Sequence, residues 1–263
     1  MRTAFSKAEI ESQIANRFGP SLKLHSKLPV EIISTGVREI DSLTGGLPRG
    51  AITEIFGPAS SGRTSMMLAA LAFASTHDEV CALVDTNDVL EPKSAADAGI
   101  DFDRLLWIRC ASSVEHAFKA TDLLLQGGGF GLVMLDLGDV PPQQARRIIS
   151  SWWYRFRRVV ENTPTALVVI AQDSCVRSCA ALSLEMRKED DTWTSVSSPI
   201  FSDSRRPIIQ SQQPGSGYKL PSSDRGYLSS GPYLLRGTQL HLNRQRPIQL
   251  AGRETQFRAA ASV

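Results

Sequence analysis

A glycine-framed loop is the part of this sequence best suited to chemistry. Residues 57–65 read Gly-Pro-Ala-Ser-Ser-Gly-Arg-Thr-Ser and stand between an apolar run at 52–56 and a second one that begins at Met66. This is the G-x-x-x-x-G-K-[ST] layout in its strand-loop-helix context, with Arg63 at the lysine position. Backbone N–H groups of such a loop surround phosphates, and the hydroxyl of Thr64 is placed to hold Mg²⁺. The predicted nucleotide-binding residues of the loop are Gly57, Pro58, Ala59, Ser60, Ser61, Gly62, Arg63, Thr64 and Ser65.

Asp136 supplies a second group for the same site. It closes an apolar run at residues 132–136. In a doubly wound sheet such a strand places its final carboxylate at the carboxyl edge, beside the loop. Asp136 is then expected to orient Mg²⁺ through water while Thr64 binds it. Loop and carboxylate together predict Mg²⁺-ATP as the ligand.

Arg63 changes what this loop can do. Arginine keeps the positive charge, but its planar fork is larger than a compact ammonium and cannot follow the same path between the β- and γ-phosphates. We therefore expect weak nucleotide binding and weak or no hydrolysis.

The elements that must position these groups are alternating strands and helices. Continuous apolar runs predict strands buried on both faces, and helical stretches between them predict parallel crossovers. The fold class is therefore α/β, with a mostly parallel central sheet flanked by helices. Strands are predicted at 52–56, 81–85, 105–108, 132–136, 166–171 and 182–186, and helices at 64–75, 114–126 and 142–160.

The two ends of the chain differ from this core. Apolar residues spaced by four predict a short amphipathic helix at 6–17 that docks on a neighbour, followed by a Pro/Gly-containing linker. The segment 190–233 is rich in Ser, Pro and Gly, which predicts an irregular or disordered insertion. A last strand, 234–243, is expected beside 182–186. The predicted divisions are 1–31 (helix and linker), 32–189 (core), 190–233 (insertion) and 234–263 (closing strand and basic tail).

The composition excludes several classes of protein. Hydrophobic residues make up 42% and charged residues 21% of 263 residues, as in ordinary globular proteins. No apolar run approaches a membrane span, and the first residues lack a signal peptide's apolar middle, so we expect a cytoplasmic protein. The four cysteines are expected to be reduced thiols, because their irregular spacing suits neither a disulfide framework nor a zinc site.

Positive charge is concentrated locally although the net charge is only +2. The helix predicted at 142–160 carries five arginines and no acid between residues 146 and 158, beside several aromatic residues. Arginines with aromatics predict contact with DNA phosphates by non-specific electrostatics, or docking of a protein partner. Core packing of the aromatics and a solvated helix face explain the same pattern, and both alternatives stay open. The candidate contact residues are Arg146, Arg147, Arg155, Arg157 and Arg158.

Several stretches resemble the RecA recombinase core. Residues 33–50, which run into the loop, are similar to its opening, and 81–92 (CALVDTNDVLEP) followed by 95–110 (AADAGIDFDRLLWIRC) are similar to its next strand and helix. Residues 166–172 (ALVVIAQ) resemble the strand that ends in its phosphate-sensing glutamine, here Gln172. The resemblance covers about 33–187 and implies a RecA-type P-loop NTPase core.

The departures from RecA are as informative as the matches. Asn87 stands where RecA has the glutamate that activates the attacking water, and an amide cannot act as a base. Asp88 is the one nearby carboxylate that could replace it, and it is a weak catalytic candidate. Ser94 stands where RecA has an adenine-stacking tyrosine. The two loops through which RecA binds DNA are short here, which argues against a recombinase filament.

This combination resembles the ImuA family, the RecA-like accessory proteins of bacterial damage-response cassettes. The shared marks include the short N-terminal helix, GGLPRGA before the loop strand, RSCAALSLE at 177–185 and LLRG at 234–237. The resemblance implies an adaptor in SOS-linked translesion synthesis, with an ImuB-like polymerase-family protein and an error-prone DNA polymerase as partners, and self-association as a further expectation. The alternatives are an active DNA-dependent ATPase of the recombinase group and a cell-division inhibitor acting in the damage response.

Overall fold

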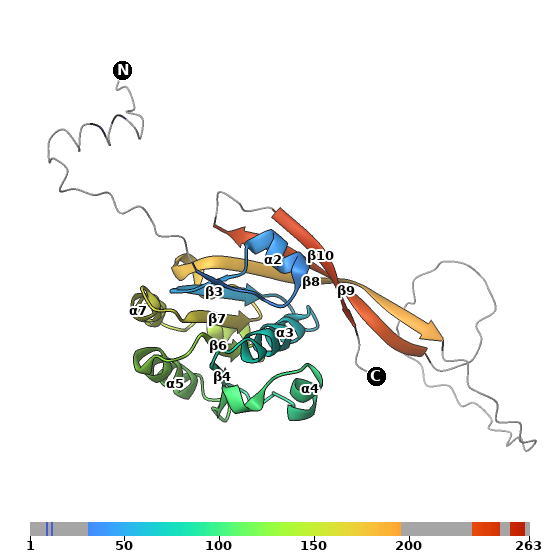
Figure 1. The fold of residues 1–263 in the computed structure, drawn as a ribbon, viewed down its shortest axis with the longest axis horizontal. Helices are drawn as coiled ribbons and strands as arrows, with labels where there is room; N and C mark the ends of the chain where they lie inside the picture. Colours follow the sequence, from blue (N-terminus) through green and yellow to red (C-terminus); the bar gives the residue numbers. More distant parts are fainter. Residues whose placement is uncertain (1–8, 10–11, 13–30, 196–232, 248–252, 261–263) are drawn as a thin grey trace, which may run out of the picture.

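The computed structural model describes residues 9, 12, 31–195, 233–247 and 253–260. Within these ranges one eight-stranded sheet crosses the molecule in the order β10-β9-β8-β3-β7-β6-β4-β5 (Figure 1). A two-stranded antiparallel sheet, β1 (Ile32–Ile33) with β2 (Leu47–Pro48), precedes it. The chain therefore forms the predicted α/β fold around one dominant sheet.

Five neighbouring strands, from β3 to the sheet edge at β5, are parallel, as predicted. The register pairs β3 with β7, β7 with β6, β6 with β4, and β4 with β5. Four of the five are buried almost throughout, which explains their continuous apolar sequences; β5, at the sheet edge, is only partly buried. These strands are β3 (Ala51–Phe56), β4 (Cys81–Asp85), β5 (Leu105–Arg109), β6 (Leu132–Leu137) and β7 (Ala166–Ala171).

Helices cover both faces of this sheet (Figure 1). One apolar core lies under α2 (Arg38–Thr44), α3 (Arg63–Thr76) and α4 (Pro92–Asp97). A second core lies under α5 (Val114–Gly127), α6 (Pro142–Ala145) and α7 (Ser150–Val160). Two 3₁₀ turns, η2 (Phe102–Arg104) and η3 (Arg177–Cys179), complete the connections.

The helix predicted at 142–160 is wrong as one element. The structure ends α6 at Ala145 and begins α7 at Ser150. Ile149 caps α7 with extended backbone, φ −65° and ψ 128°. Two adjacent β-branched residues, Ile148 and Ile149, disfavour the helical conformation at this point.

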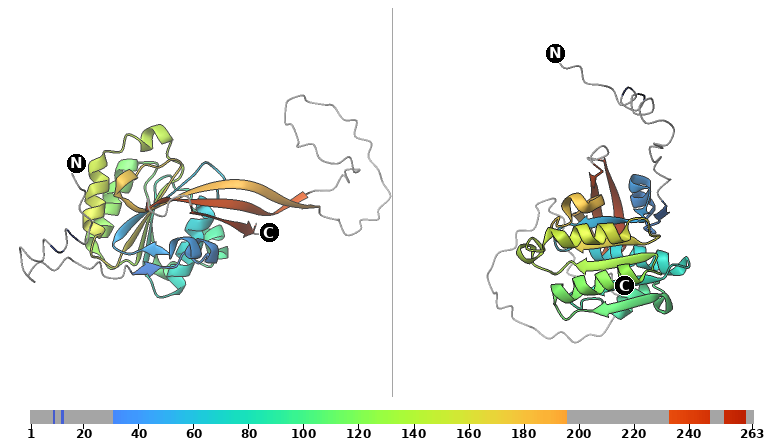
Figure 2. Two further views of the ribbon diagram at one scale, coloured as in Figure 1. Left: turned by 90° about the horizontal axis from the view of Figure 1, so that it is seen from above. Right: turned by 90° about the vertical axis from the view of Figure 1, so that its left-hand side faces the viewer.

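Three long strands complete the sheet and project from its body (Figure 2). β8 (Ala180–Ser195) runs parallel to β3, β9 (Tyr233–Arg246) runs antiparallel to β8, and β10 (Arg253–Ala260) antiparallel to β9. The prediction that the closing strand lies beside 182–186 is confirmed.

The predicted strands in this region are too short. β8 continues to Ser195, and β9 already includes Tyr233, so both ends of the segment 190–233 are strand and not irregular. The predicted basic tail likewise contains β10. Strand pairing explains the difference. Trp193 lies opposite Leu235 in the antiparallel hairpin, so the backbone of this Ser-rich segment is paired with the facing strand although its composition does not favour a strand.

Other predictions fall outside the described residues. Of the predicted helix at 6–17, only Glu9 and Ser12 are described, both helical. Residues 196–232 of the predicted insertion are not among the described ones.

All four cysteines are buried and free. Among the described helices, none has the length and apolar character that crossing a membrane requires.

Candidate nucleotide site

The predicted phosphate loop connects β3 to α3. The Gly57 N–H donates to the carbonyl of Ala171 at 3.3 Å, which ties the loop to the end of the neighbouring strand β7. The Ser61 N–H donates to the Pro58 carbonyl at 3.2 Å and tightens the turn. Gly62 then caps α3 with φ 87°, in the left-handed region that favours glycine. The loop therefore has the strand-turn-helix geometry that its sequence predicts.

Both glycines of the loop are also required by packing. A Cβ at Gly57 would lie 2.1 Å from the Met186 carbonyl oxygen of β8, and a Cβ at Gly62 would lie 2.3 Å from Leu240 Cδ1 of β9. Leu240 is 1% exposed. The hairpin β8–β9 thus packs directly against the loop. The contact of Leu240 with the loop was not predicted, because the residues around Leu240 indicate only a closing strand.

The loop presents polar groups that a phosphate could satisfy. Pro58, Ala59, Ser60, Thr64 and Ser65 are exposed. The first N–H groups of α3 have no acceptor within the helix. The Ser61 hydroxyl is buried and has no hydrogen-bond partner among the residues that the structure describes. These groups fit a bound phosphate.

Arg63 is directed toward the end of β6. Its side chain is buried, and Nη1 donates to the Gly138 carbonyl at 3.2 Å. Burial lowers the pKa of the guanidinium, while the nearby carboxylates of Asp136 and Asp139 act in the opposite direction. The loop's cation therefore bridges the loop to β6 in this structure.

Asp136 lies where the sequence predicts it, near the carboxyl end of β6. Oδ1 accepts the Gly138 N–H at 2.7 Å. Burial raises the pKa of this carboxyl from 3.8 to about 6, and the Gly138 N–H and Arg63 partly oppose that shift. Thr64 and Asp136 are the residues that would hold Mg²⁺, since one presents an exposed hydroxyl and the other a carboxylate at the same edge.

The position of the missing base is polar but holds no carboxylate. Asn87 Nδ2 donates to Ser112 Oγ at 3.4 Å, and Asn87 Oδ1 is buried with no partner in the described ranges. Ser94 lies in α4, exposed, with its N–H donating to the Glu91 carboxylate. An unpaired amide oxygen can accept from water but cannot remove its proton.

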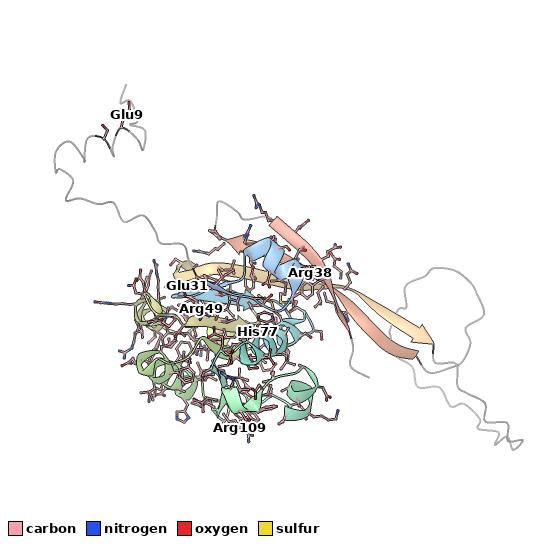
Figure 3. All side chains as sticks on the ribbon, in the orientation of Figure 1. Glu9, Glu31, Arg38, Arg49, His77 and Arg109 are labelled. Atoms are coloured by element: carbon pink, nitrogen blue, oxygen red, sulfur yellow. The ribbon has the colours of Figure 1, made fainter. Side chains whose placement is uncertain are left out.

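The Asp88 carboxylate contacts residues next to β5, the neighbour of β4 at the sheet edge. Its backbone is left-handed, φ 58°, and Oδ1 accepts the Ala111 N–H at 3.3 Å. Oδ2 lies 3.5 Å from Arg109 Nη2, at the edge formed by β5 (Figure 3). Both contacts direct the Asp88 carboxylate toward β5, at the edge of the sheet, so this carboxylate is already engaged there.

Two buried carboxylates were missed by the sequence analysis. Asp85, 1% exposed at the end of β4, accepts from Val89 N–H, Leu90 N–H and Trp107 Nε1 at 3.1, 3.0 and 3.2 Å. Its register partner in β6 is Asp136. Asp85 thus orders the turn that carries Asn87.

Glu54 in β3 is the second buried carboxylate. It accepts from the Cys175 N–H, the Val176 N–H at 2.7 Å, and the hydroxyls of Ser174 and Ser183 at 2.8 and 3.2 Å. It therefore fixes the segment that follows β7 and the adjacent Gln172. A single glutamate inside the apolar run ITEIF was the available signal.

The five candidate arginines divide into two groups. Arg146 pairs with Asp173 at 2.8 Å, and Arg155 donates twice to Asp122 of α5, at 2.6 and 2.7 Å. Beside them, Trp153 and Phe156 are buried against Phe118, so core packing of these aromatics is confirmed. Three exposed residues have no ion pair within the described part of the chain: Arg147, Arg157 and Arg158.

Comparison with known proteins agrees with this architecture. Protein RecA of Deinococcus radiodurans is 33% identical over 181 residues, covering 61% of this chain and 50% of that protein. Protein RecA of Psychrobacter cryohalolentis is 36% identical over 132 residues, 48% of this chain and 37% of that protein. The chain thus spans about half the length of the curated relatives it matches, or less. Residues 5–146 match the family described as the RecA N-terminal domain, and the chain belongs to that family.

Proposed function

We propose that this chain is a RecA-like accessory protein of the bacterial DNA damage response. In this proposal it is an ImuA-like, cytoplasmic adaptor that supports error-prone translesion synthesis and binds Mg²⁺-ATP weakly. Its partners are an ImuB-like polymerase-family protein and an error-prone DNA polymerase, and the N-terminal segment is a candidate for self-association.

The orientation of Arg63 carries the nucleotide part of the proposal. Its guanidinium already donates to Gly138 and lies in the field of two carboxylates. A nucleotide would have to compete for that cation, and a planar fork replaces the compact ammonium of the usual loop. Weak binding follows from both effects.

The connections at the carboxyl edge support an adaptor over a recombinase. After β7, Glu54 accepts four hydrogen bonds from residues 174–183 and holds the short segment in place. After β6, Arg63 bonds to Gly138, and α6 begins at Pro142. Neither connection leaves a long free loop for a DNA strand.

ATP and Mg²⁺ remain the cofactors that fit the residues present. When bound, Mg²⁺ would neutralise phosphate charge between Thr64 and Asp136. The chain's own contribution would be the N–H groups of the loop and the Ser61 hydroxyl, which lacks a partner among the described residues. Asn87 can orient a water but has no basic group, so hydrolysis is expected to be slow.

Calorimetry and phosphate release, each with and without single-stranded DNA, test the nucleotide part. We expect weak Mg²⁺-ATP binding and turnover far below that of a recombinase. Robust DNA-stimulated turnover that disappears in Asp136→Ala would overturn the adaptor proposal and establish the DNA-dependent ATPase. That alternative is favoured by the preserved Thr64, Asp136 and Gln172.

Co-purification after DNA damage tests the partner part. The tagged full chain should retain the ImuB-like protein, and Asp136→Ala should retain it equally, because the proposed adaptor role does not need turnover. Recovery of cell-division proteins in place of the polymerase-family protein would contradict the translesion proposal.

A further inference from the structure

We propose that α7 and the amino edge of the sheet form a binding surface for single-stranded nucleic acid, separate from the nucleotide loop. The surface consists of Tyr154, Arg157, Arg158, Arg177 and Arg246, and we refer to it as the arginine surface. Two of its members, Arg177 and Arg246, lie outside the arginine run that the sequence singles out. The surface does not rest on the proposed function, because neither nucleotide nor a polymerase contributes to it.

The topology brings three separate segments to one edge. β8 starts beside the start of β3, since Ala180 pairs with Ile52, so η3 lies at the amino edge. β9 runs antiparallel to β8, and its last residue, Arg246, pairs with Ser183 near the same edge. α7 returns from the carboxyl edge toward the start of β7, which places its last turn at the amino edge as well. The contacts of α7 with η3 join these segments.

Two buried thiols lie within range of the charges of three of these arginines, Arg157, Arg177 and Arg246. Cys179 of η3 is 5% exposed, and burial raises its pKa, while the charges of Arg157 and Arg246 act against that increase. The charge of Arg177 acts in the same way on buried Cys175. Arginines from α7, η3 and β9 thus surround one small region.

The charges of this surface are not neutralised by ion pairs. None of its four arginines has an ion pair or side-chain hydrogen bond to another described residue. Arg49, also at the amino edge, by contrast donates hydrogen bonds to Glu79 and to the Pro164 carbonyl. Glu161, the residue that follows α7, is exposed and forms no ion pair within the described ranges. The surface therefore keeps positive charge available for an anionic partner.

Tyr154 favours a nucleic-acid strand over an acidic protein. Tyr154 is 56% exposed and lies one turn before Arg157 and Arg158 on the outer face of α7. An exposed aromatic ring beside guanidinium groups suits base stacking with phosphate contact, the combination that binds single strands without sequence preference. α7 has 11 residues and is thus about 16 Å long, which leaves room for several contacts.

Fluorescence anisotropy with a labelled oligothymidine tests the proposal on the full chain. The variant Arg157→Gln/Arg158→Gln/Arg177→Gln should bind at least tenfold more weakly, and its slope of log K against log salt should be shallower by about 2, at about 0.7 per lost contact. The matched control, Lys93→Gln/Lys119→Gln/Arg187→Gln, removes three charges that are already paired with acids. The control should bind like the wild type.

Tyr154→Ala separates the two classes of partner and also serves if the triple variant fails to fold. It should weaken oligothymidine binding about tenfold and duplex binding of the same length far less. Equal loss in the triple variant and its control would overturn the surface. Competition by polyglutamate as strong as by oligothymidine, with no effect of Tyr154→Ala, would overturn the nucleic-acid assignment and indicate an acidic protein partner. ATP binding measured on the same variants should not change.

Discussion

The two edges of the sheet use their charged groups in opposite ways. At the carboxyl edge, Arg63 bonds to Gly138, Asp136 accepts the Gly138 N–H, and Asp85 accepts three hydrogen bonds. At the amino edge, Arg157 and the other members of the arginine surface have no ion pairs within the described ranges. The carboxyl edge has the layout of a nucleotide site, but most of its charged groups are bonded within the protein. The charged groups of the amino edge remain available for a partner.

The segment 172–179 connects these two edges. It leaves β7 at the carboxyl edge and reaches β8 at the amino edge, and Glu54 binds it midway. The difference between the two edges therefore depends on this buried carboxylate. It holds the segment after β7 in place at the carboxyl edge and so leads Arg177 to the amino edge. Substitutions at either end of this contact network should therefore differ in the sign and size of their effects.

Glu54→Gln should destabilise the protein most, by about 3 kcal/mol or more. The carboxylate accepts from donors on both oxygens, and the glutamine amide would turn a donor toward donors in a fully buried place. Urea unfolding measures the loss. Ser183→Ala, which removes one donor and leaves the carboxylate, should cost only about 1 kcal/mol. Equal stability of wild type and Glu54→Gln would show that segment 172–179 is held by other contacts.

Asp136→Asn should have the opposite sign and stabilise the protein by about 3 kcal/mol at pH 7.5. Burial raises the carboxyl pKa from 3.8 to about 6, so the folded state takes up a proton at higher pH than the unfolded state. The charged form is therefore penalised above pH 6, by about 1.4 kcal/mol per pKa unit, and the penalty disappears as the pH falls toward 4. Asparagine can still accept the Gly138 N–H.

Urea unfolding at pH 7.5 and pH 4.5, without Mg²⁺, checks this prediction. The stability advantage of the variant should shrink at the lower pH, while Mg²⁺-dependent nucleotide binding should be lost at both. An advantage that does not change with pH would mean that Asp136 is not the group responsible.

Much of this architecture could be predicted from the sequence because it follows from local patterns. The strand Cys81–Asp85 and the strand Ala166–Ala171 have the predicted bounds, since burial on both faces leaves continuous apolar runs between turns. The loop and Asp136 are likewise local signals that the parallel sheet brings to one edge.

The remaining features depend on pairing across long separations. Leu240 against Gly62, and Trp193 opposite Leu235, follow from the register of the hairpin, which no local pattern specifies. The importance of Glu54 depends on a segment about 120 residues away in sequence. Arg246 reaches the amino edge, where its charge and that of Arg157 both act on Cys179, only because β9 runs antiparallel to β8. Composition could therefore locate the charged run but not the surface it belongs to.

Arg63→Lys should restore part of the nucleotide affinity at the carboxyl edge, by about tenfold, or about 1.4 kcal/mol. A lysine ammonium reaches phosphates as a compact charge and lacks the guanidinium Nη1 that donates to Gly138. Calorimetry with Mg²⁺-ATP measures the gain. Adding Asn87→Glu should then raise phosphate release, because a carboxylate can accept the proton of the attacking water. Unchanged affinity in Arg63→Lys would place the defect elsewhere, for example at Ser94.

Trp107→Phe should produce the smallest change, a loss of about 1 kcal/mol. It removes the indole N–H that donates to Asp85 at 3.2 Å, but Val89 and Leu90 still donate to that carboxylate. Because Trp107 is only partly buried, water can replace part of the lost bond. The phenyl ring also keeps a face for the Arg109 guanidinium, which lies 5.5 Å from the ring centroid of Trp107.

Urea unfolding of Trp107→Phe beside Arg109→Gln separates the two contacts. A loss above about 3 kcal/mol would mean that Asp85 depends on the indole, so that the carboxyl edge is held by single bonds and not by several donors acting together.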